Sequence, residues 1–161
     1  MRLADLKKIW SWNVQKDDTV EITGYKGQDS IVEIPAEIQG KTVTAIGCQA
    51  FSPCKERLRV DRRNYLANGL KGVIFPDGLK TIGWLAFSGC AQLDNLNIPD
   101  SVKQIDDAAF SGCTSLRYIR LPKNSGRLKA QYSQAVPLLK NYVYPMASNL
   151  LRAGHLGIAL S

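Results

Sequence analysis

The apolar positions of the chain recur in a fixed order, with 23 residues between one copy and the next. The residues that keep this interval are Leu70, Leu93 and Leu116; Pro76, Pro99 and Pro122; Ile82 and Ile105; Phe87 and Phe110; and Cys90 and Cys113. Two full units read LKGVIFPDGLKTIGWLAFSGCAQ and LDNLNIPDSVKQIDDAAFSGCTS, and a third begins LRYIRLPKN at Leu116 before the pattern is lost. Because a unit this short cannot bury its own apolar face, the pattern predicts units stacked on one another.

An earlier, stretched copy precedes these units. It reads IVEIPAEI from Ile31 and VTAIGCQAFSPC up to Cys54, with five additional residues before Ile46 and thirteen after Cys54. The apolar positions resume in phase after each insertion, which indicates loops at the edge of the stack. We therefore expect about four units, with the longer insertion over residues 55–69.

Each unit contains the signals of a strand, a second wall and a turn. The segment L-x-x-L-x-I-P alternates as a short strand does, and its proline ends the strand by removing a hydrogen-bond donor. Strands from successive units then form a parallel sheet with about 4.8 Å between neighbours. The following V-x-x-I supplies a second wall, and the A-F pair allows the Phe87 and Phe110 rings to nest. The S-G-C ending fits a short helical turn closed by Gly89 or Gly112 in the left-handed conformation.

The repeat resembles the BspA-type leucine-rich repeat family, whose units read approximately L-x-x-I-x-I-P-x-S-V-T-x-I-G-x-x-A-F-x-x-C-x-x. The matching residues of one unit are Leu93, Leu96, Ile98, Pro99, Ser101, Val102, Ile105, Ala109, Phe110 and Cys113. Asp106 departs from the usual glycine, and Trp84 departs from the small or polar residue that usually follows that glycine. The resemblance implies an α/β fold, namely a right-handed leucine-rich-repeat solenoid with short parallel strands. It also implies a bacterial or protist origin and, for many relatives, a surface or secreted role in adhesion.

A stack of repeats needs a cover at its first unit, and residues 1–29 are expected to provide it. Alternation over Thr19–Thr23, followed by a turn at Tyr25–Gly27, predicts an antiparallel strand or β-hairpin. Family members often begin with a similar segment. The apolar residues of Met1–Trp12 have helical spacing.

The other end of the stack is expected to have a helical C-terminal cap or tail over residues 129–161, after repeats that occupy residues 30–128. Apolar residues from Lys129 to Arg152 follow helical spacing, and Pro145 is expected to kink or split the helix. The apolar tail over residues 154–160 leaves open an oligomerisation segment that would make the protein a homo-oligomer.

The formal net charge of +7 is concentrated in the last third of the chain. Residues 1–107 have 14 basic and 14 acidic side chains, whereas residues 108–161 have seven basic side chains and no acidic one. Because these charges are dispersed, we favour a solvated surface over a site for nucleic acid or an acidic partner. The basic insertion is interpreted in the same way, since it has no stacking aromatics or known docking module around it.

No pattern of catalytic, metal-binding or cofactor-binding residues emerges. Cys54, Cys90 and Cys113 share one repeat position and are expected to point into the core as small apolar side chains. His155 is the one histidine of the chain, and there is no C-x-x-C pair, P-loop or dinucleotide fingerprint. We therefore expect a non-enzymatic protein with no cofactor and no metal. At 161 residues it is expected to form one domain, without a membrane span or an apolar block long enough for a secretory signal.

Recognition is expected on the strand residues that alternate with the buried ones, because these positions are free to vary. The candidate binding residues are Glu33, Lys71, Ile74, Asp94, Asn95, Asn97, Arg117, Tyr118 and Arg120. Tyr and Arg are common anchors of protein interfaces. The sequence thus favours non-catalytic binding of another protein or macromolecule through the strand face, and ordinary solvated strand residues are the open alternative.

Overall fold

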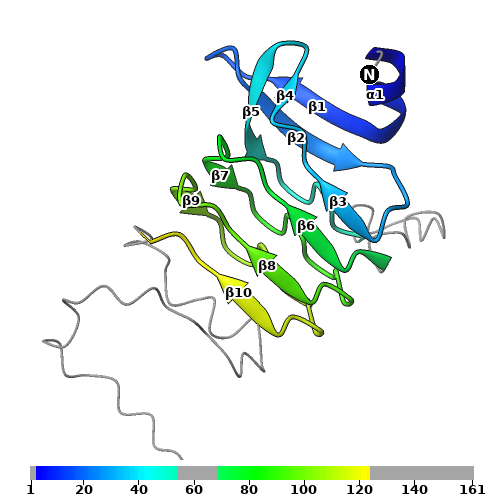
Figure 1. Ribbon diagram of the computed structural model, residues 1–161, viewed down its shortest axis with the longest axis vertical. Helices are drawn as coiled ribbons and strands as arrows, with labels where there is room; N and C mark the ends of the chain where they lie inside the picture. Colours follow the sequence, from blue (N-terminus) through cyan, green and yellow to red (C-terminus); the bar gives the residue numbers. More distant parts are fainter. Residues whose placement is uncertain (1–2, 54–68, 124–161) are drawn as a thin grey trace, which may run out of the picture.

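The computed structural model describes residues 3–53 and 69–123, in which successive turns of chain lie one upon another (Figure 1). One side of the stack is a four-stranded sheet in the order β3-β6-β8-β10, made of β3 (Ile31–Glu33), β6 (Gly72–Ile74), β8 (Asn95–Asn97) and β10 (Tyr118–Arg120). All three pairings are parallel, and Leu96 lies opposite Ile119, 23 residues later. Residues one repeat apart are therefore ladder partners, as the period predicts.

A second sheet forms the opposite side of the stack. Its repeat strands are β5 (Lys41–Ile46), β7 (Thr81–Ile82) and β9 (Gln104–Ile105), which pair in parallel. The short β4 (Glu37–Ile38) pairs antiparallel with β5, within the five-residue insertion before Ile46.

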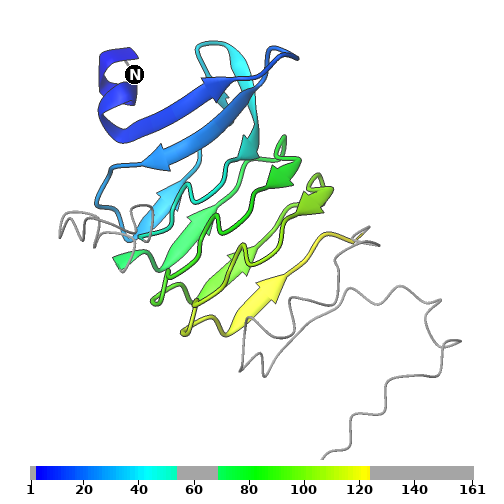
Figure 2. The ribbon, with the colours of Figure 1, turned by 180° about the vertical axis from the view of Figure 1, so that it is seen from behind.

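The expected N-terminal hairpin is present. It consists of β1 (Trp10–Val14) and β2 (Val20–Tyr25), which pair antiparallel, and β2 continues the second sheet by pairing in parallel with β5. Figure 2 shows this hairpin at the opposite end of the stack from β10. The helix α1 (Leu3–Ile9) precedes the hairpin. It ends before Trp12, the last residue of the segment with helical spacing, because Trp10 is buried in a strand that pairs with β2.

The core lies between the two sheets. In the first sheet, each strand buries its middle residue, namely Val32, Val73, Leu96 and Ile119. The rings of Phe51, Phe87 and Phe110 form a column, with centroids 4.7 Å apart in the first pair and 5.5 Å apart in the second. The predicted nesting of the Phe87 and Phe110 rings is confirmed.

Two of the three cysteines at the shared repeat position face the core as expected. The thiols of Cys90 and Cys113 are buried and donate to the carbonyl oxygens of Phe51 and Phe87, at 3.4 and 3.3 Å. Burial raises the pKa of the Cys113 thiol to about 12, so the group stays protonated at neutral pH. Cys54 lies outside the described residues.

The S-G-C endings are tight turns rather than helices. Gly89 and Gly112 have φ angles of 79° and 75°, the left-handed conformation that the sequence predicts for them. The expected α/β class therefore has one short helix, α1, within the described residues, and the repeats themselves are built of strands and turns.

Three of the sequence predictions concern segments outside the described residues: the insertion over residues 55–69, the helical C-terminal cap or tail over residues 129–161, and the oligomerisation tail. No helix in residues 3–53 and 69–123 has the length and apolar character needed to cross a bilayer. In the same residues, no group of three His, Cys, Asp or Glu side chains is placed to hold a metal ion.

Candidate functional site

The candidate site is the solvent-facing side of the β3-β6-β8-β10 sheet, which we call the strand face. Successive side chains of a strand point to opposite sides, so the residues that flank each buried middle residue face solvent. With the residue that precedes three of these strands, the strand face consists of Ile31, Glu33, Lys71, Gly72, Ile74, Asp94, Asn95, Asn97, Arg117, Tyr118 and Arg120. All nine residues selected from the sequence lie on this face.

One end of the strand face is apolar. Ile31 and Ile74 are 61% and 53% exposed, and they lie on the neighbouring strands β3 and β6. Glu33 pairs with Ile74 across the ladder and is also exposed. Ile31 and Ile74 thus occupy diagonal positions on the two strands, and large apolar side chains left exposed near one another are a recognised feature of binding surfaces.

At the other end, Arg120 binds its own fold. Its guanidinium donates to Asn97 Oδ1 at 3.1 Å and to the Ile98 carbonyl at 3.4 Å, and it reaches both carboxylate oxygens of Asp100 at 3.3 and 3.2 Å. The backbone N–H of Lys123 donates to Asp100 at 3.0 Å and, with Arg120, holds the pKa of that carboxyl below its usual range. These contacts fasten β10 to the preceding unit, a role that the sequence analysis did not assign to Arg120.

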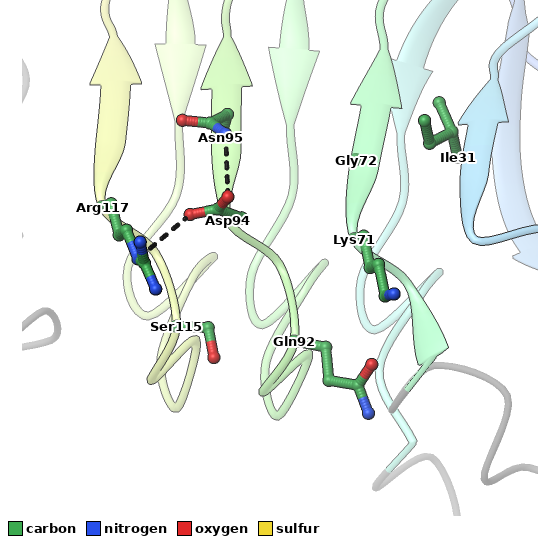
Figure 3. A pocket seen from close by; sticks show the side chains of 8 residues that line it. All are labelled: Ile31, Lys71, Gly72, Gln92, Asp94, Asn95, Ser115 and Arg117. Carbon is green, nitrogen blue, oxygen red and sulfur yellow. Dashed lines mark hydrogen bonds and ion pairs between the residues drawn. The ribbon is translucent and has the colours of Figure 1, made fainter.

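A cluster of polar side chains lies where β8 and β10 begin. Asp94 Oδ2 accepts a hydrogen bond from the Asn95 amide at 3.0 Å, and Asp94 Oδ1 lies 3.6 Å from Arg117 Nε (Figure 3). Oδ1 is buried without a hydrogen bond, and the Arg117 side chain is 85% exposed. Arg117 is therefore held loosely and keeps donors available to a partner.

A hollow of about 540 Å³ opens at this part of the strand face (Figure 3). The strands contribute Ile31, Lys71, Gly72, Asp94, Asn95 and Arg117 to its lining, and the turns contribute Gln92 and Ser115. The hollow arises because Gly72 has no side chain, whereas its ladder partners on either side, Ile31 and Asn95, each have one.

The hollow brings together four of the nine residues selected from the sequence, namely Lys71, Asp94, Asn95 and Arg117. The other five, Glu33, Ile74, Asn97, Tyr118 and Arg120, lie on the same face but do not line the hollow. Ile31, Gly72, Gln92 and Ser115 were not selected. A glycine in the interior of a predicted strand was the one available signal for Gly72, whereas the turn residues become lining residues only through the fold.

Comparison with known proteins agrees with the repeat architecture. Residues 62–149, more than half of the chain, match the family model described as a BspA type leucine rich repeat region (6 copies). This match continues through residues 124–149, which lie outside the described residues and overlap the segment expected to form the helical cap. No curated protein matches the chain.

Several solved structures resemble the chain. A leucine-rich repeat protein of T. pallidum is 25% identical over 72% of this chain and 70% of its own, with a TM-score of 0.41. One from Bacteroides capillosus is 24% identical over 71% of this chain and 96% of its own, with a TM-score of 0.47. A leucine-rich cell surface protein from Faecalibacterium prausnitzii is 26% identical over 71% of this chain and 41% of its own, with a TM-score of 0.39. The family match, together with a 23-residue repeat that becomes the ladder of two sheets, shows that the chain belongs to the BspA-type leucine-rich repeat family.

Proposed function

We propose that the protein is a non-catalytic binding module that attaches to another protein through the strand face. The observation that supports this most directly is the pair Ile31 and Ile74, which are more than half exposed on adjacent strands. Neither side chain contributes to the core, and leaving both in water has a free-energy cost that burial against a partner would remove.

The remainder of the strand face supplies polar and aromatic groups beside its apolar end. Asn95 and Asn97 are exposed amides on β8, and Tyr118 is a half-buried aromatic on β10. Amide and hydroxyl groups provide the hydrogen bonds of an interface rim, and tyrosine is enriched among interface anchors. An adhesive role at a cell surface, which the family resemblance implies, belongs to the same proposal.

Affinity capture with matched variants tests the role of this face. The double variant Ile31→Thr/Ile74→Thr keeps the β-branched shape and removes apolar surface, and it is compared with Val14→Thr on the hairpin strand β1. Val14 is a suitable control because it is 49% exposed and lies outside the strand face. We expect partners from the native host to be lost with the double variant and retained with Val14→Thr, while both variants unfold at the same temperature as the wild type.

The same set of captured proteins with both variants would contradict the proposal. Binding to generic duplex DNA that weakens steeply with salt would instead support the alternative that the basic last third binds nucleic acid. Most of that segment lies outside the described residues.

A further inference from the structure

The fold itself does not need a glycine at position 72. Its φ angle is not in the left-handed region, and a Cβ there would meet only Ile31 Cγ1 and Cγ2, at the ordinary contact distances of 3.7 and 3.8 Å. Gly72 is the first residue of β6 and pairs with a residue of the neighbouring strand on each side. A glycine in a paired strand weakens it, because it has no side chain to pack and loses the most backbone freedom on folding. A glycine in a strand that neither its φ angle nor its neighbours require often marks a place where another molecule approaches the backbone.

Gly72 is also what opens the hollow. Its ladder partners Ile31 and Asn95 stand on either side, so any larger residue at position 72 would fill the space between them. Ile31 provides an apolar wall that is 61% exposed, and Asn95 provides an amide. The width of the opening is therefore determined by one residue that the fold could replace.

The charges around the hollow are unbalanced. Lys71, Asp94 and Arg117 occupy the same position at the start of β6, β8 and β10, so one carboxylate lies between two cations (Figure 3). Asp94 pairs with Arg117 at 3.6 Å, and Lys71 makes no ion pair within the described part of the chain. A second carboxylate, supplied by a ligand, would balance the charge of Lys71.

We propose that the hollow over Gly72 receives an acidic side chain from an extended segment of a protein partner, with an adjacent apolar side chain of that segment packed on Ile31. The carboxylate pairs with Lys71, on the side of the hollow away from the Asp94–Arg117 pair, and the segment approaches the backbone of β6 where no side chain blocks it. This inference rests on the proposed function, since it specifies which part of the strand face selects the partner and by what chemistry.

A titration of the full chain, followed by ¹⁵N–¹H NMR, tests the inference with blocked hexapeptides as probes. The peptides contain a central glutamate–leucine, glutamine–leucine or glutamate–serine pair and are otherwise identical. We expect the glutamate–leucine peptide to shift the amides of Gly72 and Asn95 and to bind up to about fivefold more tightly than the glutamine peptide, the range that an exposed ion pair gives. The serine peptide is expected to bind more weakly than the leucine peptide because it has no group to pack on Ile31.

Three variants separate the site from its surroundings. Gly72→Val is expected to abolish the shifts while leaving the thermal midpoint unchanged or raised, since valine favours strands. Lys71→Ala is expected to remove the preference for glutamate over glutamine, and Lys103→Ala, an exposed lysine on the other side of the stack, is expected to keep it.

Equal binding of the glutamate and glutamine peptides, shifts confined to other parts of the chain, or absence of any shift would overturn the inference. A lowered thermal midpoint of Gly72→Val would also overturn it, because the glycine would then be required by the fold. If Gly72→Val captures the same partners as the wild type while Ile31→Thr/Ile74→Thr loses them, the inference fails and the proposed function stands. If neither variant changes capture, both fail.

Discussion

Gly83 lies at a close approach between two turns of the stack. A Cβ atom on this residue would lie 2.9 Å from the Ile46 carbonyl oxygen and 3.0 Å from both the Cys48 nitrogen and the Gly47 carbonyl carbon. These contacts are with backbone atoms, which cannot rotate away as a side chain does. Gly83 therefore packs backbone against backbone on the preceding turn of the stack.

Gly83→Ala is therefore expected to lower the free energy of unfolding by about 1–3 kcal/mol, the usual cost of overpacking. The matched control is Gly69→Ala, because a Cβ at Gly69 would meet nothing within 4 Å. Its free energy of unfolding is expected to change by no more than about 0.5 kcal/mol. Urea denaturation followed by circular dichroism measures both values, and equal stabilities would contradict the close approach.

At the scale of elements, one side chain adds several contacts to the backbone ladder that joins β10, the last described strand, to β8. Arg120 on β10 has hydrogen bonds to Asn97, to the Ile98 carbonyl and to Asp100, and its side chain is only 31% exposed. Arg117, three residues earlier, has one ion pair and is 85% exposed. Two arginines that look equivalent in the sequence thus have different roles in the structure.

Arg120→Ala is expected to lower the free energy of unfolding by about 1 kcal/mol, because it removes several hydrogen bonds and the packed alkyl stem at once. Arg117→Ala is expected to change it by less than about 0.5 kcal/mol, as is usual for an exposed pair. Thermal and urea unfolding of both variants provide the comparison. A larger loss for Arg117→Ala would show that the contacts of Arg120 do not hold β10 in place.

Tyr25, the last residue of β2, links the hairpin to the segment that leads into β3. Its hydroxyl donates to Asp29 Oδ2 at 2.6 Å, and its ring lies over Gly27, where a Cβ would collide with it. Burial, together with the hydrogen bond to Asp29, raises the pKa of Tyr25 to about 12 from an ordinary value of 10.0. The folded state thus favours the protonated phenol.

The stability that this phenol contributes is therefore complete below pH 10 and is lost as the pH rises from 10 toward 12. We expect the wild type to be more stable than Tyr25→Phe by about 0.5–1.5 kcal/mol at pH 8, the usual value of one hydrogen bond. The difference is expected to shrink across that window. Urea denaturation of the two proteins at several pH values measures it, and a constant difference up to pH 12 would contradict the assignment.

The elements that the sequence predicts well are those that repetition determines. A 23-residue period makes Leu96 and Ile119 neighbours in a parallel ladder, and alternation then decides which residues reach the strand face. The end of α1 at Ile9 was less predictable, because Trp10 satisfies both a helical spacing and the strand that pairs with β2. The role of Arg120 was not predictable, since it depends on a carboxylate 20 residues away that only the stacking brings near.

At the scale of the whole molecule, one aromatic column runs from the hairpin through the described repeats. Trp10 packs on Tyr25 with 4.7 Å between ring centroids, and Tyr25 stacks on Phe51 at 5.9 Å. Phe87 and Phe110 continue the column in the following turns. Since each turn contacts mainly its neighbours, the column is a principal means by which one unit stabilises the next.

The loss of unfolding free energy on removing a ring should depend on how many other rings that ring contacts. Phe87 is fully buried, stacks on Phe51 and Phe110 and meets Phe75 edge-on, whereas Phe110 stacks on Phe87 alone among the described rings. We expect Phe110→Ala to lower the free energy of unfolding by about 3–5 kcal/mol, and Phe87→Ala to lower it by at least as much. If Phe87→Ala does not fold, Phe87→Leu retains most of the volume and allows the same ranking.

A double-mutant cycle between Phe87 and Phe110 isolates the contact itself. Rings stacked at 5.5 Å and 11° are expected to show a coupling of about 0.5–1.5 kcal/mol beyond the burial of either ring. With Trp84 replaced by Phe, tryptophan fluorescence comes from Trp10 and Trp12 in β1 and reports on the hairpin end. Circular dichroism reports on the strands, so coincident transitions would show that the column unfolds as one unit. A loss below about 1 kcal/mol for Phe110→Ala, or zero coupling in the cycle, would mean that the turns are held together by their backbone ladders and not by the rings between them.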